Sequence, residues 1–132
     1  MKYLLDTDTC IYFLNGNQNI ANKIANQNDS DVCVTIFNIA ELMFGAYNSK
    51  KVNHNLKRVT EFKNRIIVLN SVNDSIVKLF AYEKAVLRKR GMIIGDIDLF
   101  IAAFAIFYNL ILVTNNYSHF KHISTLKIEN WI

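Results

Sequence analysis

The sequence contains no proline, only four glycines and only two cysteines in 132 residues. No proline- or glycine-rich linker divides it, so we predict a single domain with its own hydrophobic core. The two cysteines, Cys10 and Cys33, both lie among apolar residues. We expect reduced core thiols of a cytoplasmic protein and no disulfide framework.

Long hydrophobic runs are also missing. The longest, from Leu99 to Tyr108, is about half the length that a membrane-spanning helix needs, so we predict a core helix there. No basic segment followed by a cleavage site opens the sequence, and export is not expected. The net charge of +4 and the pI of about 9.1 favour an anionic partner such as nucleic acid.

Short apolar runs separated by amphipathic segments predict an α/β fold. Strands are expected at Lys2–Asp6, Asp31–Thr35, Arg65–Leu69 and Leu110–Thr114, with a fifth, at an edge, over Leu126–Asn130. Helices are expected at Asp8–Gly16, Ile20–Gln27, Phe37–Asn48, Val52–Asn64, Asn73–Arg90 and Ile97–Tyr108. Because the strands are uninterrupted apolar runs, they predict a central parallel sheet covered by helices on both faces.

Polar residues follow several of these strands. Asp6 ends the first strand, Thr35 ends the second and leads to Glu41, and Thr114–Asn116 follow the fourth. Sites in parallel sheets lie beyond the carboxyl ends of the strands. These side chains are therefore predicted to gather at one edge.

The first strand runs directly into acids in the stretch "YLLDTDTC". An isolated buried carboxylate is unfavourable, so Asp6 needs a helix N-terminus, a metal ion or covalent chemistry to compensate it. Asp6 can cap the following helix, but Thr7, Asp8 and Thr9 are equally suitable caps. We expect Thr7 or Asp8 to cap the helix, which leaves Asp6 free for another role.

Two further helices carry acids in apolar surroundings. Glu41 has Phe37 four residues before it and Phe44 three residues after it, on the same helix face. Its carboxylate either reaches water at the edge of the core or is held in a lined pocket. In "GDID", Asp96 and Asp98 do not share a helix face. We expect Asp96 to be the N-cap and Asp98 to be an acid of the first turn.

Convergence of Asp6, Glu41 and Asp98 would require a counter-charge. Two like charges near 4 Å repel by roughly 4 kcal/mol at an effective dielectric of about 20, so three pairs reach roughly 12 kcal/mol. Protons or a divalent cation must offset this, and oxygen ligands favour a hard ion, Mg²⁺ or Mn²⁺. Such an ion in a basic protein points to phosphodiester chemistry.

The remaining polar residues carry weaker signals. Surface or packing roles are expected for His119 and His122, and His54 lies in a polar helix with no functional signal. A basic cluster before the Asp98 helix consists of Lys84, Arg88, Lys89 and Arg90. It either is a solvated face or contacts substrate phosphates through Arg88, Lys89 and Arg90.

Four segments in this order, "LLDTDTCIYFLNG", "TIFNIAELMFGA", "RKRGMIIGDIDLFIAAFA" and "ILVTNNYSHF", followed by "LKIENWI", resemble a PIN-domain protein, and more narrowly a VapC-type toxin. The resemblance runs nearly end to end and implies a single PIN-like domain over residues 1–132, folded as an α/β/α sandwich. It further implies a Mg²⁺- or Mn²⁺-dependent endoribonuclease of the bacterial cytoplasm that acts on RNA, often a tRNA.

The same resemblance implies a homodimer and an antitoxin partner that itself binds operator DNA. Parts of Cys10–Leu14 and of the helix Phe37–Tyr47 are expected to form the antitoxin groove. The implied reaction is attack of a metal-held water on an RNA phosphorus, assisted by a carboxylate base, which leaves a 5′-phosphate.

Carried over residue by residue, the resemblance assigns catalysis and metal binding to Asp6, Glu41 and Asp98. Asn116 stands where many relatives carry a fourth acid, which puts a strong second metal site in doubt. Supporting roles are expected for Thr7, Thr114, Asn115 and Asn116. Asp8 and Asp96 lie at less regular positions and are secondary candidates for the metal.

Two alternatives remain open. "DTDTC" also approaches the signature of haloacid-dehalogenase-type phosphatases, with Asp6 as nucleophile and Asp8 as general acid. Against that alternative, Cys10 replaces the usual Thr or Val, the chain is short and Glu41 has no role. The second alternative is a catalytically inactive PIN-like binding module, for which Asn116 is the only support.

Overall fold

Strands and helices alternate along the chain in the computed structural model, which describes residues 1–132. The strands are β1 (Tyr3–Leu5), β2 (Val32–Thr35), β3 (Ile67–Leu69), β4 (Ile111–Val113) and β5 (Lys127–Glu129). The helices are α1 (Thr7–Leu14), α2 (Gln18–Ala25), α3 (Ile36–Tyr47), α4 (Val52–Arg65), α5 (Asp74–Lys89), α6 (Asp96–Phe107) and α7 (Tyr117–Phe120), with a 3₁₀ turn, η1, at Asp29–Asp31.

The five strands form one sheet in the order β3-β2-β1-β4-β5, and every neighbouring pair is parallel. The α/β prediction with a parallel sheet is confirmed, and β5 lies at an edge as expected. Strand β1 is central, with β2 on one side and β4 on the other. The strand order therefore reverses beside β1, and a crevice at such a reversal is where α/β sheets bind ligands.

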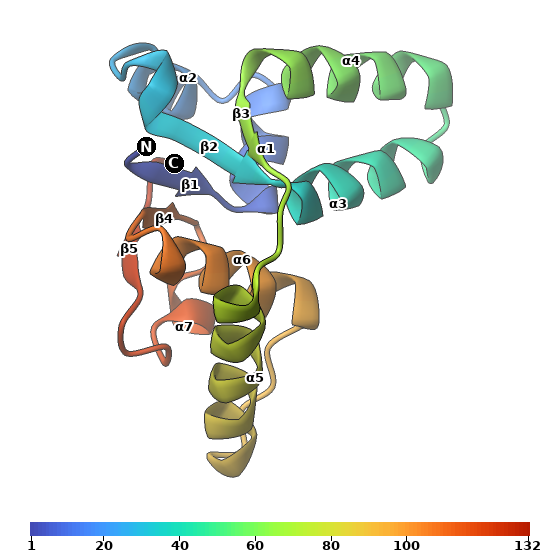
Figure 1. The fold of residues 1–132 in the computed structure, drawn as a ribbon. Helices are drawn as coiled ribbons and strands as arrows, with labels where there is room; N and C mark the ends of the chain where they lie inside the picture. Colours follow the sequence, from blue (N-terminus) through green and yellow to red (C-terminus); the bar gives the residue numbers. More distant parts are fainter.

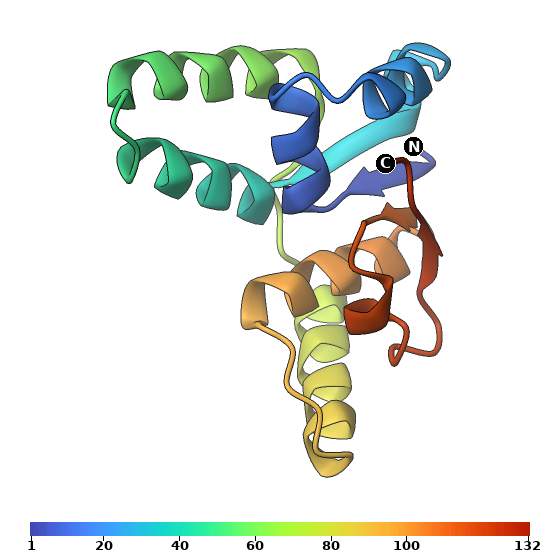
Figure 2. The same ribbon diagram turned by 180° about the vertical axis from the view of Figure 1, so that it is seen from behind.

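The side chains of β1 alternate between the two faces of the sheet and contribute to a hydrophobic core on each. Tyr3 and Leu5 belong to one core and Leu4 to the other, because successive side chains of a strand point to opposite faces. Figures 1 and 2 show helices α1–α4 over one face of the sheet and α5–α7 over the other. The two chain ends lie close together in both views.

A stack of aromatic rings joins α3 of the first face to α5 and α6 of the second. The ring of Phe100 lies 4.8 Å from that of Phe37 and 3.9 Å from that of Phe80, nearly parallel to both. Phe104 of α6 is fully buried beside them. This stack fixes α3 against α6, the two helices that carry Glu41 and Asp98.

Several local predictions were wrong. Helix α1 starts at Thr7 and its cap is Asp6, whose side chain accepts from the Thr9 amide, so neither Thr7 nor Asp8 caps it. Helix α6 starts at Asp96 with Gly95 as N-cap, so Asp96 does not cap it. No sequence pattern indicated η1 or α7.

Both cysteines are free and buried, as predicted. None of the helices combines the length and the apolar character that crossing a membrane requires.

Candidate active site

A cavity of about 310 Å³ opens at the carboxyl ends of the central strands. Its wall combines acids from three elements: the start of α1, the middle of α3 and the first turn of α6. The cavity is lined by Asp6, Thr7, Asp8, Ile11, Glu41, Phe44, Gly45, Asp98, Asn116 and Phe120. The predicted convergence of Asp6, Glu41 and Asp98 on one cavity is therefore what the structure has.

Asp6 is the most deeply buried acid, with 4% of its surface exposed. Its Oδ1 accepts from the backbone N–H of Thr9 at 2.8 Å. Burial raises the pKa of the Asp6 carboxyl, and hydrogen bonds from Thr114 and Thr9 offset this only in part. Asp6 can cap α1 and also line the cavity, because a carboxylate has two oxygens and several lone pairs.

Glu41 is half-buried on α3 and receives the hydroxyl hydrogen bond of Thr7 on its Oε1. Burial raises the pKa of the Glu41 carboxyl, and the nearby charges of Asp98, Asp8 and Asp6 raise it further. These mutual effects place the four acids within electrostatic reach of each other. Of the two sequence interpretations of Glu41, the lined pocket is the correct one.

A buried amide that the sequence analysis missed directs the Thr7 hydroxyl. Asn38 is fully buried, and its Oδ1 accepts from the backbone N–H and the hydroxyl of Thr35 at 2.7 and 2.8 Å. Its Nδ2 therefore faces the Leu5 carbonyl and the Thr7 hydroxyl oxygen, each at 3.2 Å. Since that oxygen accepts from Asn38, its single proton is donated to Glu41.

We expect Asn38→Asp to lower the free energy of unfolding by about 1–3 kcal/mol, because the Leu5 carbonyl and the Thr7 hydroxyl lose their donor in a buried site. Urea denaturation of the variant beside wild type measures this. Asn53→Asp is the control, since Asn53 is exposed on α4 and its replacement should change stability by less than about 0.5 kcal/mol. Equal stability of the two variants would contradict the role given to Asn38.

Asp98 has a hydrogen-bond partner that the sequence analysis did not predict. The His119 ring packs edge-on against Phe120, in line with the expected packing role. Its Nε2 atom also lies 3.2 Å from the Oδ2 atom of Asp98, which that expectation did not include. Burial raises the pKa of the Asp98 carboxyl, and His119 lowers it. His119 belongs to α7, the short helix that the sequence did not signal, so the contact had no pattern to reveal it.

The secondary candidates divide into two groups. Asp8 and Asn116 line the cavity. Asp96 instead points away and forms an exposed ion pair with Lys84 at 2.8 Å. Asn115 is exposed and accepts from Asn130 at 3.1 Å.

Thr114 and the basic cluster also lie outside the cavity lining. Thr114 is buried behind it, where its hydroxyl accepts from the Asn116 N–H at 2.9 Å. Within the basic cluster, Arg88, Lys89 and Arg90 are exposed at the C-terminal end of α5, which Figure 1 shows far from the sheet. His54 is exposed on α4, and the carbonyl of His122 accepts from Arg90 at 3.4 Å.

The donor set fits a hard divalent cation, because the acids present oxygen atoms and no Lys or Arg lines the cavity. As the side chains are placed, no group of three His, Cys, Asp or Glu residues lies close enough together to enclose one ion. Mg²⁺ is commonly held by one or two carboxylates and keeps several of its waters, so it does not require three protein ligands on one ion. The acids of the cavity lining from which one or two such ligands could come are Asp6, Asp8, Glu41 and Asp98.

Comparison with known proteins agrees with this geometry. The sequence model of the PIN domain family matches residues 3–126. The chain belongs to the PIN domain family. Within it, the chain is 35% identical over 132 residues to ribonuclease VapC2 of Haemophilus influenzae, covering 100% of this chain and 99% of that protein. It is 31% identical to the tRNA(fMet)-specific endonuclease VapC of Salmonella typhimurium, covering 99% and 98% of the two chains.

Solved structures of VapC relatives superpose along the full length. DNA-bound VapBC from Salmonella typhimurium matches with a TM-score of 0.93 at 32% identity, covering 100% of this chain and 99% of that one. VapBC2 from Rickettsia felis, bound to a fragment of its promoter, matches with a TM-score of 0.89 at 31% identity and covers both chains completely. The PIN domain membership of the chain leaves no place for the phosphatase alternative.

Proposed function

We propose that this PIN domain protein is the toxin of a toxin–antitoxin system and hydrolyses RNA phosphodiester bonds with the help of Mg²⁺ or Mn²⁺. The observation that supports the proposal most strongly is the shared cavity of Asp6, Glu41 and Asp98, which come from three separate elements. Burial raises the pKa of all three, so each gains from a nearby cation. We propose these three as the catalytic and metal-binding residues.

When bound, the cation supplies charge stabilisation at the phosphoryl oxygens and a water of lowered pKa. The residues of the chain do the rest. Thr7 holds Glu41 through its hydroxyl, and His119 holds Asp98, so both acids keep fixed orientations. One carboxylate of the set accepts the proton of the attacking water, and cleavage leaves a 5′-phosphate.

We further propose that the substrate is a tRNA, since two enteric relatives carry the name tRNA(fMet)-specific endonuclease. The place of action is then the bacterial cytoplasm. The Salmonella and Rickettsia relatives were solved as VapBC complexes bound to DNA. By analogy the chain forms a homodimer and binds an antitoxin, and it meets operator DNA only through that antitoxin.

The antitoxin groove predicted over α1 and α3 has a counterpart beside the active site. Ile11 and Leu14 of α1 face Leu42 and Ala46 of α3 across a groove of about 230 Å³. Cys10 is fully buried and takes no part. The groove continues past Leu14 into a larger cavity of about 350 Å³ between α1, α2 and α4.

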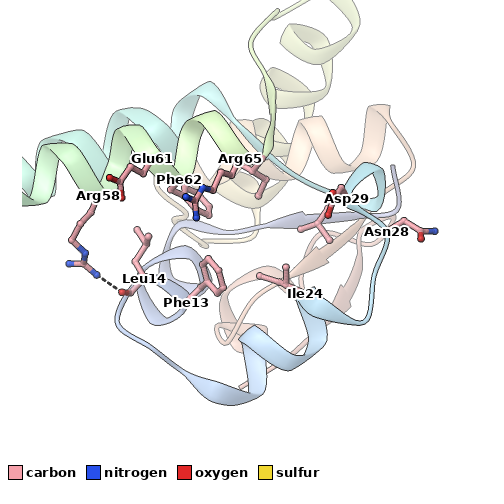
Figure 3. Close-up of a pocket in the computed structure, with 11 residues that line it drawn as sticks. Phe13, Leu14, Ile24, Asn28, Asp29, Arg58, Glu61, Phe62 and Arg65 are labelled. Atoms are coloured by element: carbon pink, nitrogen blue, oxygen red, sulfur yellow. Dashed lines mark hydrogen bonds between the residues drawn. The ribbon is translucent and has the colours of Figure 1, made fainter.

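Figure 3 shows Phe13, Leu14, Ile24 and Phe62 gathered in that larger cavity, with Arg58 donating to the Leu14 carbonyl at its edge. The apolar face of a helix suits this lining. We propose the groove and the cavity together as the antitoxin site.

RNA cleavage by the purified protein, freed of any bound antitoxin, tests the proposed function. We expect bacterial tRNA to be cut in Mg²⁺ or Mn²⁺ and to stay intact when EDTA is added, because the buried acids need the cation. Denaturing gels and sequencing of the new 5′ ends measure the reaction. Adding back excess Mg²⁺ after EDTA is the control and should restore cleavage.

Intact RNA under both metals would favour the inactive binding module instead. Cleavage that persists in EDTA would show that RNA is cut without the cation, and it would refute the metal part of the proposal alone.

A further inference from the structure

Phe44 is an exposed aromatic ring within the active-site cavity. It lies three residues after Glu41 on α3, and 69% of its surface is exposed. Phe37, four residues before Glu41, is stacked on Phe100 in the core. No aromatic ring of the chain stacks on Phe44. Packing in the core therefore accounts for Phe37. It does not account for Phe44, whose ring is mostly exposed.

The residues around Phe44 determine which kind of chemical group can bind against its ring. Four carboxylates, from Asp6, Asp8, Glu41 and Asp98, line the same cavity, and no Lys or Arg does. A phosphate group finds no cationic side chain there. A nucleobase is neutral and flat, and aromatic side chains recognise unpaired bases by stacking.

We propose that Phe44 is a stacking platform for one unpaired base of the RNA, next to the phosphate that is cleaved. This inference rests on the proposed ribonuclease function and adds that the RNA is unpaired at the cleavage site. A paired base is already stacked within its helix, so a platform at the cavity selects a loop or an unpaired end. Ile11, 42% exposed on α1, provides a second apolar contact at the rim of the same cavity.

A protein segment is the other possible occupant of this ring. Because Phe44 lines the cavity itself, a segment resting on it would also cover the carboxylates beside it. The cavity must be open to RNA when the enzyme acts, so the occupant during catalysis is the substrate. A second copy of the chain seated on Phe44 is an outcome that the experiment separates.

The test compares steady-state cleavage of an initiator tRNA transcript by wild type, Phe44→Leu and Phe44→Tyr. Leucine keeps apolar bulk and loses the aromatic face, so we expect KM to rise about tenfold with kcat nearly unchanged. Tyrosine keeps the face and should retain the wild-type KM. Tyr82→Leu is the matched control, because Tyr82 is 65% exposed on α5, away from the cavity.

A second substrate makes the test specific for stacking. Once the cut is mapped, transcripts lacking the base on either side of it are assayed. Removal of the stacked base should raise the wild-type KM about tenfold and leave that of Phe44→Leu unchanged, since partners in one contact are not additive.

Unchanged kinetics of Phe44→Leu, while wild type cleaves, would overturn the stacking proposal and leave the proposed function standing. A shift from dimer to monomer in light scattering of Phe44→Leu would assign the ring to an interface between copies and overturn it as well. No cleavage by wild type would instead refute the proposed function.

Discussion

Asp6→Asn, Glu41→Gln and Asp98→Asn are each expected to lower kcat/KM for RNA cleavage by roughly a thousandfold or more. Each change keeps the shape of the side chain and removes its charge. A cation clamp on phosphoryl oxygens is worth several kcal/mol, and about 1.4 kcal/mol corresponds to a factor of ten. Single-turnover cleavage of tRNA at saturating Mg²⁺ measures the loss.

The fold should survive these changes. Asparagine is as good an N-cap as aspartate, so Asp6→Asn keeps the hydrogen bond from the Thr9 amide that starts α1. Circular dichroism and thermal unfolding check this for each variant. Loss of activity with the fold intact separates chemistry from structure.

Asp96→Asn is the matched control for Asp98→Asn. The two residues lie in the first turn of the same helix, but Asp96 pairs with Lys84 outside the cavity. Its change should leave cleavage within about twofold, because an exposed ion pair contributes little. Equal effects of the two changes, or activity retained in Asp98→Asn, would contradict the proposed site.

Periodicity and element ends were sufficient to predict the sheet. Runs such as Val32–Thr35 and Ile111–Val113 are continuous and apolar, which predicts buried parallel strands, and each meets a clear polar boundary. The same logic placed Asp6 at the end of the first strand and Glu41 on the helix that follows the second strand. Their convergence then followed from the rule that parallel strands point their carboxyl ends to one edge.

Side-chain contacts between distant segments could not be predicted in that way. The pair of His119 with Asp98 joins residues 21 positions apart through a four-residue helix. Asn38 looked like an ordinary helix residue, yet it links β1, α1 and α3. Hydrogen-bond partners of this kind depend on packing geometry, which periodicity does not encode.

Metal-free protein is expected to become less stable as pH rises above about 4, and the cation should reverse this. Burial raises the pKa of Asp6, Glu41 and Asp98, so the native state binds more protons than the unfolded chain between the ordinary pKa, near 3.8 to 4.5, and the raised value. Stability falls through that window and levels off above it. Thermal unfolding in EDTA at a series of pH values measures the trend.

At neutral pH, Mg²⁺ or Mn²⁺ at a hundred times its Kd should stabilise the native state by about 2.7 kcal/mol. For a chain of this length that is a rise in Tm of roughly 10 °C. Glu83 is the internal control: burial raises its pKa too, outside the cavity, so Glu83→Gln should reduce the pH slope and leave the cation effect unchanged.

Asp6→Asn should show the opposite pattern. Without cation it should unfold at a higher temperature than wild type at neutral pH, because the amide keeps the cap and has no charge to bury. It should also gain less from the cation. A Tm in EDTA that rises steadily between about pH 4 and 7 would mean that the carboxylates are stabilised by contacts within the chain. The cavity would then have no need of an ion, and the metal-dependent mechanism would lose its physical basis.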